Sequence, residues 1–170
     1  MGMNDSILII GLGNEYRSDD GLGIYAAREI RRRKIPGVAV AELAGEGTSL
    51  MQAWSGRSRV ILIDAISSGA QAGEIHRLDV ATDPIPSHYF HYSSHAFGVA
   101  EAVGLARTLH RVPDVLLLFG IEGKQFDAGP GLTDPVLRSM PDLLALIELD
   151  LCRLGRHGAM PDTPGHSAVV

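Results

Sequence analysis

The sequence predicts an α/β fold with three layers, in which helices cover both faces of a mostly parallel central sheet. Three segments, each centred on an unbroken apolar run, have the composition of strands buried on both faces; they span 7–10, 59–65 and 115–121. Segments with apolar residues at helical spacing follow them, over 21–34, 94–110 and 134–154. Strands that alternate with helices in this way are typical of a parallel sheet.

The first half of the chain supplies two further strands. Residues 38–43 follow a Pro-Gly turn and are predicted as a strand, and a short helix after them contains Trp54, the only tryptophan and a core anchor. Residues 74–79, EIHRLD, alternate in polarity. This alternation predicts a half-exposed, antiparallel edge strand with His76 on the surface.

A proline-containing loop is expected over residues 83–92, where regular structure is disfavoured. Ser93 and Ser94 come next, and both are good N-cap residues. A helix is therefore predicted from residue 94 or 95 to residue 110, with His95 in its first turn.

A single domain is predicted over residues 1–154, with a mobile tail over 155–170. The last helix, 134–154, keeps one apolar face to its end, and Pro141 is expected to restart it because proline disrupts a helix interior. Beyond it the helical spacing is lost and Gly and Pro recur.

Composition indicates a globular chain and limits the partners to be expected. The 170 residues are 45% hydrophobic, with both charge signs mixed, a net charge of -5 and one cysteine, Cys152. An acidic chain lacks the electrostatic footprint of a nucleic-acid-binding protein, and a single cysteine excludes an internal disulfide. No signal peptide or membrane-length apolar run is visible, so we expect a cytoplasmic protein without membrane insertion, and a monomer is favoured.

The stretch between the first strand and the first helix, GLGNEYRSDDGLG, is the strongest candidate for a site. Gly11-x-Gly13 begins like a dinucleotide fingerprint, but the third glycine is replaced by Tyr16 and the loop carries two carboxylates that would repel a phosphate. Gly11, Gly13 and Asn14 are expected to shape the loop by tight turns and side-chain hydrogen bonds. We therefore expect the loop to bind a ligand other than a dinucleotide.

A metal site is the interpretation that the predicted order of strands favours. The carboxyl ends of parallel strands meet at one edge of a sheet, so the Asp19/Asp20 loop and Asp64, which ends the strand 59–65, are expected to converge there. His95 would enter from the start of the following helix. Two carboxylates and one imidazole are suitable ligands for a divalent ion with open positions.

Each ligand also has a plainer interpretation. Asp20 could cap the first helix, His95 could be a surface histidine, and Asp19 is expected to cap or to support the site from behind. Asp64 is harder to dismiss, because a carboxylate that ends a buried strand must be solvated, paired or ligated. A rival pair, His91 and His95, has zinc-helix spacing but lacks the HExxH motif.

Five motifs together resemble one known family, the maturation endopeptidases of nickel-iron hydrogenases. They occur in the family's order between residues 7 and 154, and read GLGNEYRSDDGLGIYAA, LIDA, SHAFGVAEAV, FGIEG and LTDPV. The resemblance implies that Asp20, Asp64 and His95 are the metal-binding and catalytic residues. The family often has glutamate at the position of Asp20, so the carboxylate here has a shorter reach.

The resemblance also implies a reaction and a partner. Members remove a short C-terminal peptide from the hydrogenase large-subunit precursor after nickel insertion, and nickel in the precursor serves as the recognition signal. Another divalent metal could occupy the isolated protein. Two alternatives stay open: a non-enzymatic nickel chaperone with the same ligands, and a small-molecule metallohydrolase on a related fold, for which a second set of metal ligands is not evident.

Overall fold

The computed structural model of the chain describes residues 6–90 and 98–157. Five strands and four α-helices fill this part of the chain, in the alternating order that the sequence predicts. The strands are β1 (Ile7–Leu12), β2 (Val38–Leu43), β3 (Arg59–Ile66), β4 (Ile75–Asp79) and β5 (Val115–Glu122). The helices are α1 (Leu22–Arg33), α2 (Gly47–Ala53), α3 (Val99–Thr108) and α4 (Asp134–His157), and a 3-10 turn, η1 (Ser18–Gly21), precedes α1.

One five-stranded sheet with the order β2-β1-β3-β5-β4 forms the centre of the molecule. The pairs β1–β2, β1–β3 and β3–β5 are parallel, whereas β4 is antiparallel to β5, with Ile75 opposite Ile121. The inner strands β1, β3 and β5 are almost wholly buried, and the edge strands β2 and β4 are half-exposed. The mostly parallel sheet and its antiparallel edge strand are thus confirmed.

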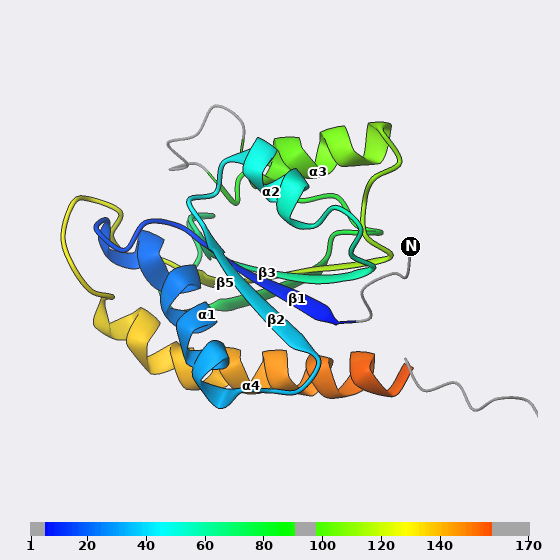
Figure 1. Cartoon of the computed structure of the whole chain (residues 1–170). Helices are drawn as coiled ribbons and strands as arrows, with labels where there is room; N and C mark the ends of the chain where they lie inside the picture. Colours follow the sequence, from blue (N-terminus) through cyan, green and yellow to red (C-terminus); the bar gives the residue numbers. More distant parts are fainter. Residues whose placement is uncertain (1–5, 91–97, 158–170) are drawn as a thin grey trace, which may run out of the picture.

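Helices cover both faces of this sheet and complete the three layers (Figure 1). Alternate residues of each strand enter two separate cores: Ile61 and Ile63 pack on the side of α1 and α4, and Leu62 packs on the side of α2 and α3. Trp54 is 2% exposed and belongs to the second core, as predicted. Burial of each such side chain stabilises the fold by roughly 1.5–3 kcal/mol.

Two glycines let α1 lie unusually close to the carboxyl ends of β1 and β3. A Cβ added at Gly11 would lie 2.2 Å from the Gly23 carbonyl oxygen. A Cβ added at Gly23 would lie 2.2 Å from the Ile63 carbonyl oxygen and 2.3 Å from that of Leu12. Any side chain at either position would push the helix away from the sheet, because these contacts are with backbone atoms.

The last helix corrects the prediction made for Pro141. Instead of ending and restarting there, α4 runs through Pro141 without a break. Pro141 and Leu137, whose carbonyl loses its intrahelical partner, are both exposed, so solvent can satisfy that carbonyl. The buried side, which includes Leu144 and Ile147, packs against the sheet. The helix also includes residues 155–157 of the predicted tail; residues 158–170 lie outside the described part.

The third helix is shorter than predicted at its start. It begins at Val99, and the backbone N–H of Gly98 donates to Glu101 Oε2 at 3.0 Å, which is a local N-terminal contact. The expectation that Ser93 or Ser94 caps this helix is therefore wrong. Serine is a common N-cap, but so is glycine, and the sequence alone did not distinguish them.

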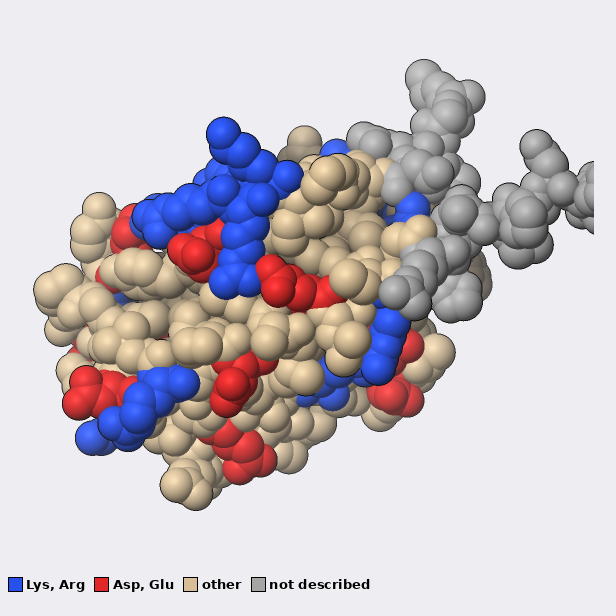
Figure 2. Space-filling model, turned by 90° about the horizontal axis from the view of Figure 1, so that it is seen from below, with Lys and Arg blue, Asp and Glu red and all other residues tan. Residues whose placement is uncertain are grey.

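Charged residues on the face covered by α1 and α4 lie beside residues of opposite sign (Figure 2). The basic run at the end of α1 forms ion pairs: Arg31 with Glu42, Arg32 with Glu29, and Arg33 with Glu148. Among the helices in residues 6–90 and 98–157, none has the length and apolar character needed to cross a membrane.

We predict that Gly23→Ala destabilises the protein by about 2–3 kcal/mol, because the added methyl group meets two backbone carbonyl oxygens. Gly104→Ala is the matched control. Gly104 also lies in a helix, but nothing is within 4 Å of an added Cβ, so the change should stabilise by roughly 0.5–1 kcal/mol. Equilibrium urea unfolding measures both, and equal stability of the two variants would contradict the close approach.

Candidate functional site

The candidate site lies at the carboxyl ends of β1 and β3, the point where the chain changes direction across the sheet. From β1 the chain passes through α1 to β2 on one side, and β3 then pairs with β1 on the other. Loops that leave the two strands diverge here and open a crevice, which is where open α/β sheets bind ligands. The 3-10 turn η1 contacts β3 at this place.

The loop before η1 folds back onto the end of β1. Gly13 has a φ of +123°, and a Cβ there would lie 1.7 Å from the Asp20 carbonyl oxygen. The Asn14 N–H donates to that same oxygen at 3.2 Å, and Asn14 Oδ1 accepts from the Tyr16 N–H at 2.9 Å. The loop-shaping roles predicted for Gly13 and Asn14 are confirmed. Their effect is to place Asp20 directly above the strand ends.

Asp64 lies close enough to Asp20 for the two carboxylates to repel each other. Asp64 is half-buried at the end of β3. Burial, and then the negative charge of Asp20, raise the pKa of Asp64 to about 8, although a 2.8 Å hydrogen bond from the Ala65 N–H acts in the opposite direction. Two carboxylates that share one place favour the binding of a proton or a cation between them.

Asp19 holds the site together and is not available as a ligand. It is 0% exposed, and its carboxylate accepts hydrogen bonds from the backbone N–H groups of Lys124, Gln125 and Thr133, and from the Thr133 hydroxyl at 2.8 Å. These donors belong to the loop after β5. Of the two roles predicted for Asp19, capping a helix or supporting the site from behind, it has the second: it fixes η1, and thereby Asp20, to a loop more than 100 residues away.

The predicted trio is brought together in part. Asp20 and Asp64 meet at one edge of the sheet, as expected from the parallel strands. His95 lies among residues 91–97, outside the described part of the chain, and so does the rival His91. Within the described residues no group of three or more His, Cys, Asp or Glu side chains could hold a metal ion. The three-ligand site thus stays a prediction.

A buried polar network beside Asp64 was missed in the sequence analysis. Glu122 is 2% exposed and accepts from the N–H and hydroxyl of Ser68, both at 2.8 Å, and from the Gly69 N–H at 2.9 Å. His76 lies next to it, with Nε2 3.7 Å from Glu122 Oε2 and Nδ1 3.2 Å from the Tyr89 hydroxyl.

The prediction that His76 is on the surface is wrong. Only 12% of its side chain is exposed, because Tyr89, from the segment after β4, covers the outer side of this edge strand. In the sheet register, Asp64, Gly120 and His76 stand in one row across β3, β5 and β4. The sequence feature that could have predicted this network is Glu122, a carboxylate at the end of a buried strand. Asp64 was identified by the same feature.

A depression of about 480 Å³ opens next to Asp20 and extends toward the ends of β1 and β2. Tyr16, 73% exposed, contributes to its rim. Its lining includes Arg28, which forms ion pairs with Glu15 at 2.8 Å and Glu42 at 3.0 Å. Asp20 is the member of the carboxylate pair that lines this depression.

Comparison with known proteins relates this geometry to one family. The family model described as hydrogenase maturation protease matches residues 24–149. Hydrogenase expression/formation protein HupD of Bradyrhizobium diazoefficiens is 31% identical over 138 residues, which cover 78% of this chain and 71% of that protein. A putative hydrogenase maturation protease of Methanocaldococcus jannaschii, MJ0253, is 29% identical, with coverage of 83% and 93%.

Solved structures with the same fold have related names. The hydrogenase maturating endopeptidase HybD from E. coli superposes with a TM-score of 0.70 at 23% identity, covering 88% of this chain and 94% of that one. The [NiFe] hydrogenase maturation protease HybD from Thermococcus kodakarensis has a TM-score of 0.64 at 26% identity, with coverage of 85% and 97%.

We predict that the stability of metal-free Asp64→Asn rises relative to wild type as the pH increases from 6 to 9. The raised pKa means that wild type is stabilised by protonated Asp64 at low pH and loses this contribution as the pH rises toward and through about 8, whereas asparagine does not titrate. The shift should be on the order of 1–2 kcal/mol. Thermal unfolding in EDTA measures it.

Asp20→Asn provides the second arm of this test. Removal of the Asp20 charge removes one cause of the raised pKa, so in that background the gain from Asp64→Asn should be smaller at pH 9. A stability difference between Asp64→Asn and wild type that is independent of pH would contradict the raised pKa of Asp64, and the same pH dependence in both backgrounds would show that the two carboxylates do not interact as described.

Proposed function

Because this chain belongs to the hydrogenase maturation protease family, we propose that it is the endopeptidase that removes a short C-terminal peptide from a nickel-iron hydrogenase large-subunit precursor. In this proposal cleavage follows nickel insertion, and the nickel carried by the precursor is the recognition signal. The single observation that supports it most directly is the pair of carboxylates, Asp20 and Asp64, held together at the crevice of the sheet.

The donor set fits a divalent cation that arrives with the substrate. Burial of Asp64, and then its repulsion from Asp20, disfavour its ionised form, so a positive charge between the two carboxylates relieves a cost that the folded protein otherwise meets by protonating Asp64. We propose His95 as the third ligand. Two oxygens and one imidazole nitrogen suit nickel and leave coordination positions for groups of the precursor. Such an incomplete set would hold little metal by itself and would retain it only when the precursor supplies the rest.

The chain's own residues then have separate roles in the reaction. Nickel in the precursor would supply a Lewis acid at the bond to be cut. Asp64 gives up its proton when it becomes a ligand, so recognition should be coupled to proton release. Asp19 keeps η1 in place during this exchange, since its carboxylate accepts four hydrogen bonds from the loop after β5. The depression beside Asp20 is the surface on which the peptide would lie.

We expect Asp64→Asn and His95→Ala each to abolish processing of the precursor while the protein stays folded, because each removes a proposed ligand but little buried apolar area. Asp20→Glu should remain active, since the charge and the ligand atom are kept. Asp142→Asn, on the exposed side of α4, is the control that should process normally. Mass spectrometry of the precursor measures cleavage, and wild-type processing by His95→Ala would remove His95 from the site.

Nickel dependence separates the protease from a nickel chaperone. The nickel-loaded precursor should be cut and the nickel-free precursor left intact, and the isolated protein should lose its nickel on dialysis because it offers so few ligands. Efficient cleavage of the nickel-free precursor would contradict nickel as the signal. Stoichiometric nickel retained by the isolated protein, with no cleavage of either precursor, would instead identify a chaperone.

A further inference from the structure

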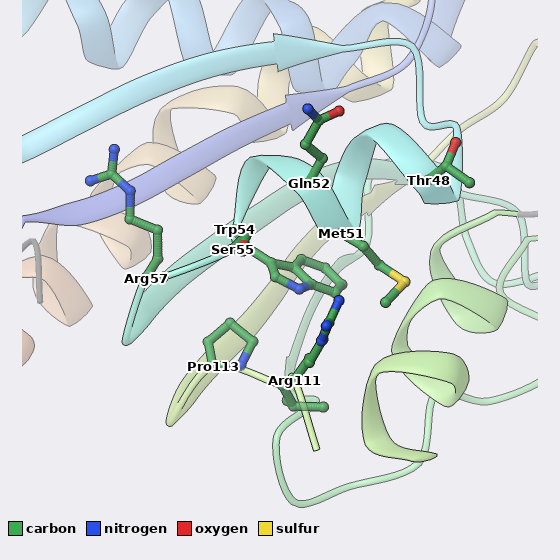
Figure 3. Close-up of a pocket in the computed structure, with 10 residues that line it drawn as sticks. Thr48, Met51, Gln52, Trp54, Ser55, Arg57, Arg111 and Pro113 are labelled. Carbon is green, nitrogen blue, oxygen red and sulfur yellow. The ribbon is translucent and has the colours of Figure 1, made fainter. Parts of the chain in front are cut away.

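A second cavity lies at the amino ends of the strands, whereas Asp20 and Asp64 lie at the carboxyl ends. It has a volume of about 680 Å³ and is formed by α2, the turn that follows it, and the segment before β5. These segments meet at the amino ends of β3 and β5, so the proposed peptidase site does not include this cavity. Figure 3 shows six of its lining residues in particular: Thr48, Met51, Trp54, Arg57, Arg111 and Pro113. Its volume is in the usual range for small-molecule sites.

The indole N–H of Trp54 is an unsatisfied donor in the wall of this cavity. Trp54 is 2% exposed, and its Nε1 is buried without a hydrogen-bond partner. Figure 3 shows the nitrogen edge of the ring turned toward Arg111 and Pro113, which line the same cavity. A buried donor without an acceptor is costly, so one that borders a cavity points to an acceptor supplied from outside.

Positive charge surrounds this donor. Arg111 is exposed, and in the described part of the chain its guanidinium has no carboxylate partner. Arg57 donates to the Ser6 hydroxyl at 2.7 Å, which is a neutral acceptor and leaves the arginine charge uncompensated by that contact. The residues that line the cavity include no aspartate or glutamate. The lining therefore attracts an anion and repels a cation.

The remaining lining is partly polar, with Thr48, Gln52 and Ser55, and partly apolar; the apolar part restricts the anion further. Met51 is a half-buried apolar residue of the lining that would gain from contact with hydrocarbon, whereas Trp54 and Pro113 are already buried. A bare inorganic anion would leave Met51 in contact with water. A carboxylate matches the planar fork of a guanidinium and can also accept from the indole N–H.

We propose that this cavity binds a small organic carboxylate with an apolar body. The carboxylate accepts hydrogen bonds from Trp54 Nε1 and from Arg111, and the apolar body packs against Met51 and Pro113. Because the indole nitrogen is shielded from solvent in the free protein, entry requires the exposed Arg111 side chain to change its rotamer.

The chain is well suited to a direct test, because Trp54 is its only tryptophan and gives one indole N–H resonance. Phenylacetate is the probe, and phenylacetamide is its neutral counterpart. In titrations of the full chain followed by ¹H–¹⁵N NMR, phenylacetate should shift the indole resonance downfield and saturate. Phenylacetamide should bind about tenfold or more weakly, since it lacks the charge that strengthens both hydrogen bonds. Equal binding of the two compounds would overturn the proposal.

Variants and a bare anion complete the design. Arg111→Gln should weaken phenylacetate binding about tenfold or more, whereas Arg32→Gln, which removes the same charge from the exposed face of α1, should leave it unchanged. Inorganic phosphate should bind more weakly than phenylacetate. An indole resonance that does not move, undiminished binding by Arg111→Gln, or phosphate binding as tight as that of phenylacetate would each refute the proposed ligand class.

Discussion

The close approach of α1 to the ends of β1 and β3 is the constraint on which the rest of the structure depends. Gly23 lies where a methyl group would collide with the carbonyl oxygens of both Leu12 and Ile63, and Gly11 permits the same contact from the strand side. Because the helix lies this near the sheet, the position of the turn before it is also restricted. η1 is set over the strand ends, and Asp20 comes within electrostatic range of Asp64.

The same region shows how a folded protein can hold two carboxyl groups close together. Burial of Asp64 and, when it is ionised, its repulsion from Asp20 oppose folding, so other interactions must keep η1 in position. Asp19 provides them through four hydrogen bonds to the loop after β5, and the Ser18 N–H adds another to the Gly129 carbonyl at 2.8 Å. The neighbouring aspartates thus have different roles: Asp19 is buried and structural, and Asp20 lies within electrostatic range of Asp64.

The carboxyl and amino ends of the strands carry side chains of opposite charge, and they therefore favour ligands of opposite charge. At the carboxyl edge, Asp20 and Asp64 favour a cation. At the amino edge, Arg57, Arg111 and the indole N–H of Trp54 favour an anion. The two sites lie at opposite ends of the strands, so a ligand bound at one site does not contact the other site. Any influence between them would have to pass through the packed strands β3 and β5.

The sequence by itself determined the layers, the mostly parallel sheet with its antiparallel edge strand, and the convergence of Asp20 with Asp64, because apolar runs, turn residues and parallel crossovers restrict the chain to few arrangements. Tertiary structure alone decided the rest. Asp19 became structural because a distant loop supplied its donors, His76 became buried because Tyr89 covers an edge strand, and α4 continued through Pro141 because its opposite face is packed on the sheet. In each case the outcome depends on a contact with a residue that is distant in sequence or belongs to another element. Local sequence patterns do not predict such contacts.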